Sequence, residues 1–133
     1  MQVKDGMSNV VLTVGPGHSL RDAARLMSER NVGAAVVMDP DSVGPGIITE
    51  RDVLRSVAAG QDADRELVAD HLTGDAILAA PDWSLERAAE AMIDGGFRHL
   101  LVMDGGDLTG VLSMRDIVSC WAGQRTVPSE SSA

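Results

Sequence analysis

An internal repeat runs through almost the whole sequence, and a repeat limits the folds open to a chain more strongly than composition does. The string VKDGMS at residues 3–8 recurs as VADHLT at residues 68–73. The same offset continues along both copies until one residue is deleted in the second, after which it pairs Gly46 with Gly110. The chain is therefore expected to fold as two copies of one structural plan.

The repeat also sets the expected domain limits. Residues 1–60 form the first copy and residues 68–123 form the second. Residues 61–67 are interpreted as a linker, because the stretch that begins at Gly60 is rich in small and polar residues. Residues 124–133 are rich in Ser and are predicted to be a flexible tail.

Each copy is expected to contain an early helix with one buried stripe. Ser19 and Ser84 occupy N-cap positions, and Asp22 makes a capping-box pattern with Ser19. Apolar residues follow at the i, i+3, i+4, i+7 spacing of one helical face. The stripe residues are Leu20, Ala23, Ala24 and Met27 in the first copy and Leu85, Ala88, Ala89 and Met92 in the second. The alanines predict close packing of each helix on its neighbours.

Three short strands and a second helix complete the plan of each copy. Apolar runs bounded by turn residues predict the strands, and a charged stretch after the last strand predicts a helix beginning at Glu50 or Met114. The strands are expected at residues 10–14, 34–38 and 46–48 in the first copy and at residues 76–80, 99–103 and 110–112 in the second. Each copy therefore has a β-α-β-β-α plan.

The charge of the chain argues against two classes of partner. Its formal net charge is −9, whereas nucleic acids and anionic membranes attract basic surfaces, so neither is expected to bind. No apolar stretch is long enough to span a bilayer, and the first residues lack the apolar core of a signal peptide. The single cysteine, Cys120, fits a reducing compartment. These features predict a cytoplasmic protein.

No pattern of catalytic residues is visible in the sequence. His18, His71 and His99 are scattered without the spacing of metal ligands, and no nucleophile has an evident base. Cys120 lies beside Trp121 on the apolar face of the last predicted helix, where a small buried side chain is expected rather than a reactive thiol. Catalysis, a metal ion and a required cofactor are therefore not expected.

The element order and two repeated strings resemble the CBS-domain family. The strings are the opening Val-x-Asp-x-[Met/Leu]-[Ser/Thr] and a later Gly-φ-φ-[Ser/Thr]-x-Arg-Asp, in which φ is apolar, and the resemblance covers about residues 3–123. It implies a mixed α/β (α+β) fold in which two tandem CBS repeats pack about a pseudo-twofold axis as a Bateman module. It also implies clefts between the repeats that commonly take adenosine-containing ligands. Ala35 and Leu100 stand where the family's strand typically carries a proline, which leaves the identity of the ligand open.

The resemblance assigns the ribose of such a ligand to Asp52 and Asp116. A carboxylate in the first turn of a helix can accept hydrogen bonds from both ribose hydroxyls. Thr49 and Ser113 precede that turn and can donate to ribose or phosphate, next to the unpaired N–H groups of the helix start. The alternative is that these four residues only cap their helices.

The two copies differ where phosphate donors are expected. The resemblance implies a basic pair that contacts phosphate, and the second copy has Arg98 and His99 at this place, whereas the first has Gly33 and Ala34. Arg98 offers a planar fork for phosphate oxygens, and His99 contributes more when protonated. The alternative for His99 is a strand residue packed against the other half. The small Gly33 and Ala34 allow close approach of a ligand or close packing of the halves.

Two further pairs complete the predicted sites. Arg51 and Arg115 can reach a phosphate, or can pair with a neighbouring acid on the surface of so acidic a chain. Ile47 and Val111, with the strands beside them, are expected to line an apolar slot for the base.

Together these residues predict a non-catalytic regulatory module that binds AMP, ADP, ATP or another adenosyl ligand and signals by a conformational change. No attached output domain is expected, so the regulated partner is expected to be a separate protein. The alternative function is a homodimeric interaction module that binds no small molecule. The contact surface of such a dimer would be formed by Met92, Ile93, Phe97, Val118 and Trp121. The other possibility is that these side chains pack between the two halves of the same molecule.

Overall fold

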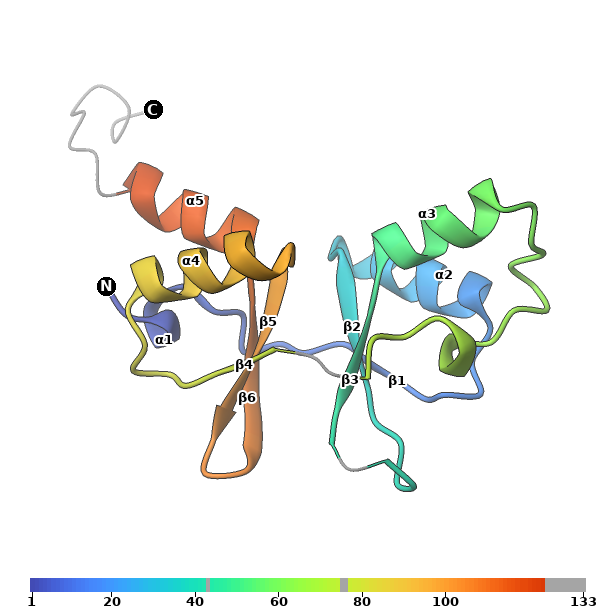
Figure 1. Cartoon of the computed structure of the whole chain (residues 1–133), viewed down its shortest axis with the longest axis horizontal. Helices are drawn as coiled ribbons and strands as arrows, with labels where there is room; N and C mark the ends of the chain where they lie inside the picture. The colour runs from blue at the N-terminus through green and yellow to red at the C-terminus, as the bar shows by residue number, and fades with distance from the viewer. Residues whose placement is uncertain (43, 75–76, 124–133) are drawn as a thin grey trace. The chain divides into compact units, whose positions relative to one another are not determined.

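The computed structural model describes residues 1–42, 44–74 and 77–123, which form two compact units (Figure 1). The β1–β3 unit consists of Val11–Ala76. The β4–β6 unit consists of Met1–Val10 and the described residues from Ile77 onward. The predicted tail at residues 124–133 lies outside the described part. None of the helices in that part is both long and apolar enough to cross a membrane.

The β1–β3 unit contains a three-stranded sheet and two main helices. Its elements are β1 (Thr13–Val14), α2 (Leu20–Arg30), β2 (Ala34–Val37), β3 (Gly46–Thr49), α3 (Glu50–Ala58) and the short 3₁₀ helix η1 (Val68–Asp70). The strand order is β1-β2-β3, with β1 parallel and β3 antiparallel to β2. The first strand is shorter than predicted, because only Val36 and Val37 of β2 pair with it.

The β4–β6 unit repeats this plan with a longer hairpin. Its elements are α1 (Val3–Gly6), β4 (Leu78–Ala79), α4 (Leu85–Gly95), β5 (His99–Asp104), β6 (Asp107–Ser113) and α5 (Met114–Gly123). The order is β4-β5-β6, again with one parallel and one antiparallel pair. Gly105 and Gly106 turn the hairpin with φ of 59° and 97°, a left-handed pair that favours glycine at both positions of a tight turn. The mixed α/β class and the β-α-β-β-α plan are confirmed.

The predicted helix starts are confirmed in both units, and each predicted stripe is buried except for Ala24 and Ala89, which are half-buried. Ser19 Oγ accepts a hydrogen bond from the Asp22 N–H, and Ser84 Oγ accepts one from the Arg87 N–H, both at 3.0 Å. A return bond from the Asp22 side chain is absent from the described hydrogen bonds, so Ser19 is a simple N-cap. The buried stripe residues are Leu20, Ala23 and Met27 on α2 and Leu85, Ala88 and Met92 on α4.

Each unit has its own hydrophobic core, and the two cores use equivalent positions of the repeat. The core of the β1–β3 unit contains Leu12, Val14, Leu20, Ala23, Met27, Ala35, Val37, Ile48 and Val68. The core of the β4–β6 unit contains Val3, Ala79, Leu85, Ala88, Met92, Leu100, Val102, Leu112 and Ile117. Val3 and Val68 are fully buried, and each belongs to the opening string of the repeat that forms the other unit. This exchange was not predicted.

Backbone hydrogen bonds fix the exchanged segments. The Val3 N–H donates to the Trp83 carbonyl at 2.8 Å, and the Val68 N–H donates to the His18 carbonyl at 2.8 Å. Within its unit, α1 contacts α5, and η1 lies beside the start of α2. The compact units therefore do not coincide with the sequence repeats. The repeat limits 1–60 and 68–123 stay predictions.

The candidate contact residues for a homodimer separate into buried and exposed groups. Met92 is fully buried in the core of the β4–β6 unit, so it packs within the molecule and offers no docking surface. Ile93, Val118 and Trp121 are exposed, to 71%, 56% and 40%. Phe97 is half-buried. Cys120 is half-buried too and packs against the same core.

Candidate functional site

In each unit the predicted ligand residues gather where a strand runs directly into a helix. In the β1–β3 unit, β3 ends at Thr49 and α3 begins at Glu50. In the β4–β6 unit, β6 ends at Ser113 and α5 begins at Met114. These two places are named here the Thr49 corner and the Ser113 corner.

Reciprocal hydrogen bonds between Thr49 and Asp52 close the Thr49 corner. The backbone N–H and the hydroxyl of Thr49 donate to Asp52 Oδ2 at 2.8 and 3.0 Å. The Asp52 N–H lies 3.3 Å from Thr49 Oγ1, to which it donates. This is a capping box, which satisfies groups left unpaired at a helix start. Thr49 and Asp52 therefore do cap α3, which was one of the two roles that the sequence left open.

The Ser113 corner has the same arrangement. The Ser113 N–H donates to Asp116 Oδ2 at 2.8 Å, and the Asp116 N–H donates to Ser113 Oγ at 3.0 Å. The repeated Gly-φ-φ-[Ser/Thr]-x-Arg-Asp string thus folds into the same local structure twice.

Capping occupies only one oxygen of each carboxylate. The described side-chain bonds to Asp52 and Asp116 all reach Oδ2, and in the described part of the chain none is recorded to either Oδ1. Both side chains are half-buried. A carboxylate held in one orientation with an uncommitted oxygen can accept hydrogen bonds from a ribose diol. Capping and ligand binding are therefore compatible at these residues.

The neighbouring strand brings the predicted small pair to the Thr49 corner. Ala34 pairs with Thr49 across β2 and β3. The Glu50 N–H donates to the Gly33 carbonyl at 2.9 Å, which ties the strand entry to the first residue of α3. Because Gly33 and Ala34 have no polar side-chain atoms, the polar side chains of this corner come from Thr49, Glu50 and Asp52.

The predicted basic pair lies at the same place on the Ser113 corner. His99 pairs with Ser113 across β5 and β6. The Met114 N–H donates to the Arg98 carbonyl at 2.8 Å, so the Arg98 backbone adjoins the start of α5. Arg98 is exposed and His99 is half-buried.

The two corners therefore differ in charge. Around the start of α5, Arg98 and Arg115 outnumber the single carboxylate of Asp116. Around the start of α3, the carboxylates of Glu50 and Asp52 outnumber Arg51. Because charges within about 8 Å still act on one another at physiological salt, the Ser113 corner suits an anionic group better than the Thr49 corner does.

In the described part of the chain, the arginines of the corners lack the acidic partners that the sequence left open. Among the described residues, the arginines that form ion pairs are Arg21, Arg25 and Arg65, and none of these pairs involves Arg51, Arg98 or Arg115. A hydrogen bond to Asp64 raises the pKa of the Arg21 guanidinium. Even in a chain of net charge −9, no carboxylate of residues 1–42, 44–74 or 77–123 pairs with the corner arginines, so these arginines suit an anionic ligand.

The predicted apolar residues lie on the same strand face as the corner hydroxyls. Ile48 and Leu112 point into the cores, so Ile47 and Val111 point to the other face of their sheets, because side chains alternate along a strand. Thr49 and Ser113 stand two residues further on and share that face. Ile47 is 7% exposed and Val111 is half-buried.

Sequence reasoning missed one component of each corner, the opening string of the other repeat. Ser8 and Val111 exchange both backbone hydrogen bonds, at 2.9 and 3.1 Å, and Thr73 and Ile47 do the same at 2.9 and 3.1 Å. The repetition of the strings at residues 3–8 and 68–73 was the available signal. Nothing local to the strings indicates which strand each one contacts.

Comparison with known proteins finds one family and several close folds. The family model described as the CBS domain matches residues 2–59 and 68–123. The CBS domain-containing protein YhcV of Bacillus subtilis (strain 168) is 34% identical over 116 residues, which cover 86% of this chain and 81% of the relative.

Two solved structures have the same fold. A hexameric CBS-CP12 protein from bloom-forming cyanobacteria is 27% identical with a TM-score of 0.83, over 89% of this chain and 66% of that one. The CBS domain protein PAE2072 from Pyrobaculum aerophilum, complexed with AMP, is 26% identical with a TM-score of 0.78, over 92% of this chain and 99% of that one.

Proposed function

The chain belongs to the CBS-domain family, and on that premise we propose that it is a non-catalytic regulatory module that binds an adenosine-containing nucleotide of the AMP or ATP kind. The observation that carries the proposal is the make-up of each corner: a carboxylate is held through one oxygen, and within the described residues its other oxygen has no recorded bond and the arginine next to it in sequence has no ion pair. PAE2072, which is complexed with AMP, supports the ligand class.

The proposed roles follow the chemistry of each side chain. Asp52 and Asp116 accept hydrogen bonds from the ribose hydroxyls through Oδ1. Thr49 and Ser113 hold these carboxylates in place and border the ribose. Ile47 and Val111 contribute apolar surface to the base. Arg51, Arg98, His99 and Arg115 bind phosphate oxygens, and Gly33 and Ala34 admit the ligand close to the backbone.

The Ser113 corner is the proposed site for the phosphorylated ligand. It carries Arg98 and Arg115 and has Met114 where the Thr49 corner has Glu50. A phosphate placed there gains from two guanidinium groups and from the start of α5, and no carboxylate stands at the first helical position to repel it. The Thr49 corner lacks this advantage, so it is expected to bind AMP more weakly.

The proposed output is a change of conformation that a separate protein detects. A ligand shifts a conformational equilibrium only by as much as it binds one state more tightly than the other. A nucleotide that contacts both the end of the strand and the start of the helix binds best when these two elements are held together, so it stabilises that conformation. No particular cofactor is required by this function.

Calorimetric titration with AMP, ADP and ATP tests the proposal, with Asp116→Asn as the decisive variant. Asparagine keeps an oxygen that can accept from the Ser113 N–H but replaces the second carboxylate oxygen with an amide donor. We expect AMP affinity to fall about tenfold or more, because a hydrogen bond to a charged group is lost. Asp107→Asn, which makes the same charge change at an exposed position of the same unit, should leave affinity unchanged.

Two results contradict the proposal. An unchanged affinity in Asp116→Asn removes this residue from the site. No binding of any of the three nucleotides at millimolar concentration, together with no rise in melting temperature, rejects nucleotide binding and favours the alternative function.

The alternative, a homodimeric interaction module, rests on exposed apolar side chains of the β4–β6 unit. Ile93 on α4 and Val118 and Trp121 on α5 are exposed, and the two helices are neighbours. The CBS-CP12 protein, which has the same fold, is hexameric, and this supports the alternative. Sedimentation of Val118→Ser tests the alternative, because loss of an apolar contact should shift a dimer toward monomer. Leu78→Ser, at an exposed position on β4, is the control.

A further inference from the structure

The opening string of each repeat is built into the unit that contains the other repeat, and it ends beside that unit's corner. We propose that Ser8 is a positioning residue for the Ser113 corner and that Thr73 is a positioning residue for the Thr49 corner. The inference deepens the proposed function and rests on it. According to the inference, the site in each repeat depends on the opening string of the other repeat.

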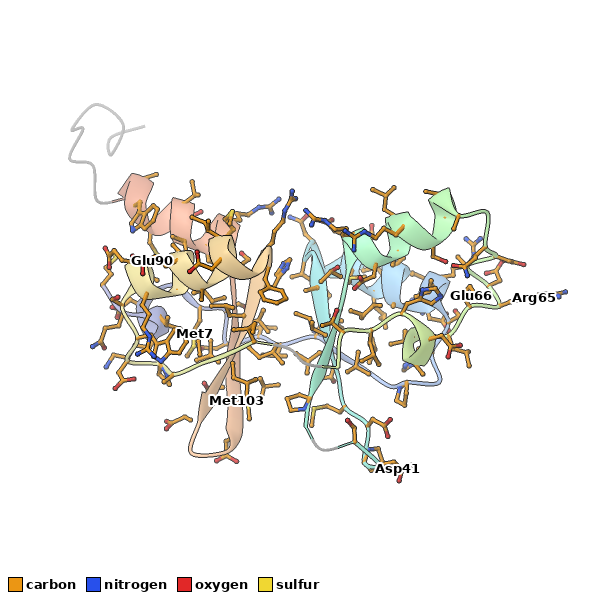
Figure 2. The ribbon with its side chains drawn as sticks, viewed as in Figure 1. Met7, Asp41, Arg65, Glu66, Glu90 and Met103 are labelled. Carbon is orange, nitrogen blue, oxygen red and sulfur yellow. The ribbon has the colours of Figure 1, made fainter. Side chains whose placement is uncertain are left out.

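The contact in the β4–β6 unit supports the first half. The Ser8 N–H donates to the Val111 carbonyl at 2.9 Å, and the Val111 N–H donates to the Ser8 carbonyl at 3.1 Å. Ser8 therefore pairs with the open edge of β6, two residues before Ser113. Upstream, Val3 is fully buried in the core, and Met7, labelled in Figure 2, packs against the same core.

The β1–β3 unit has the equivalent contact. The Thr73 N–H donates to the Ile47 carbonyl at 2.9 Å, and the Ile47 N–H donates to the Thr73 carbonyl at 3.1 Å. Upstream, His71 Nε2 lies 2.7 Å from Oε1 of Glu66, which Figure 2 labels, and Val68 is fully buried. The same construction thus occurs twice with different side chains.

The pairing matters for the corner because β3 and β6 are edge strands. An edge strand without a partner leaves its N–H and C=O groups unpaired on one side. The exchanged string satisfies these groups at Ile47 and Val111, which are the proposed base-contact residues. It thereby fixes the strand from which Thr49 and Ser113 start their helices. Loss of the pairing should loosen that corner and leave the other one in place.

Proline at residue 8 tests the pairing, and the backbone of the preceding residue already suits a proline. Ser8→Pro removes the N–H that donates to Val111. Met7 already has φ of −68° and ψ of 154°, a conformation that a residue before proline adopts. Ser8→Ala is the matched control, because it keeps both backbone bonds and loses only the Ser8 hydroxyl bond to the Val10 carbonyl. Thr73→Pro and Thr73→Ala form the equivalent pair.

The measurement is AMP affinity in a chain that also carries Asp52→Asn, so that the Ser113 corner is the remaining site. We expect Ser8→Pro to weaken AMP binding about tenfold, because the corner loses a hydrogen bond that holds its strand in place. Ser8→Ala and Thr73→Pro should change the AMP affinity less than twofold. Sequence order predicts the reverse, since Thr73 belongs to the same repeat as Ser113. Equal weakening by both prolines, or a larger effect of Thr73→Pro, overturns the inference.

Hydrogen exchange on the unsubstituted chain keeps the test valid if a proline variant does not fold. Bound AMP should slow exchange of the Ser8 and Val111 amides more than exchange of the Thr73 and Ile47 amides, because the Ser113 corner is the stronger phosphate site. Protection of the Val111 and Thr73 amides without protection of the Ser8 amide overturns the inference alone. Failure of the unsubstituted chain to bind AMP rejects the proposed function and the inference together.

Discussion

A Cβ atom on Gly110 would lie 2.6 Å from the Ser8 carbonyl oxygen. A side chain at this position is therefore incompatible with the pairing between Ser8 and β6. The equivalent Gly46 would place its Cβ 3.1 Å from the Thr73 carbonyl oxygen and 2.8 Å from a methyl group of Leu72. The glycine in each Gly-φ-φ-[Ser/Thr]-x-Arg-Asp string thus serves the exchanged opening string, which the sequence alone did not indicate.

Gly110→Ala should lower the free energy of unfolding by about 1–3 kcal/mol, because backbone atoms must move to admit the new methyl group. The control is Gly17→Ala, since a Cβ at residue 17 meets no atom within 4 Å. Urea unfolding of both variants measures the difference. Equal stability of the two variants would mean that the opening string does not approach Gly110 this closely in solution.

Val3→Ala should destabilise the β4–β6 unit by about 2 kcal/mol, because it leaves a cavity in the core around Leu85 and Leu100. Val10→Ala removes the same atoms from a side chain that is 72% exposed and should have little effect. Hydrogen exchange locates the change, and we expect faster exchange in α4 and β5. Faster exchange confined to α2 and β2 would show that residue 3 packs in its own repeat.

Ser113→Ala should cost about 1 kcal/mol of stability through loss of the N-cap of α5. Ser119→Ala, on the exposed surface of the same helix, is the matched control. Thermal unfolding followed by circular dichroism compares them. If the two melt at the same temperature, the hydrogen bond from the Asp116 N–H contributes nothing to stability.

Arg98→Ala should weaken AMP binding about tenfold and leave adenosine binding unchanged, since only AMP carries a phosphate for the guanidinium. Arg87→Ala removes an exposed arginine of the same unit that stacks on Trp83, 3.9 Å from the ring centre, and should affect neither ligand. Parallel titrations with the two ligands make the comparison. An equal loss for AMP and adenosine would show that Arg98 acts on the fold of the corner and does not contact phosphate.

Much of the local structure was predictable because its causes lie within a few residues. Ser19 and Ser84 signalled helix starts, and the stripes from Leu20 and Leu85 signalled the buried helix faces, since capping and helical periodicity are local properties. The corners followed from one repeated string. Whether Asp52 and Asp116 cap the helix or bind a ligand was undecidable from spacing, and the structure shows that capping leaves one oxygen of each uncommitted.

The sequence by itself determined that the chain contains two copies of one β-α-β-β-α plan, because hydrophobic periodicity, caps and turns are written in both. Only the tertiary structure decided which opening string completes which core. Val3 and Val68 occupy equivalent positions of similar repeats, so the side-chain pattern suits either core equally well. Packing of distant segments settles the choice, and it places Val3 with Leu85 and Val68 with Leu20.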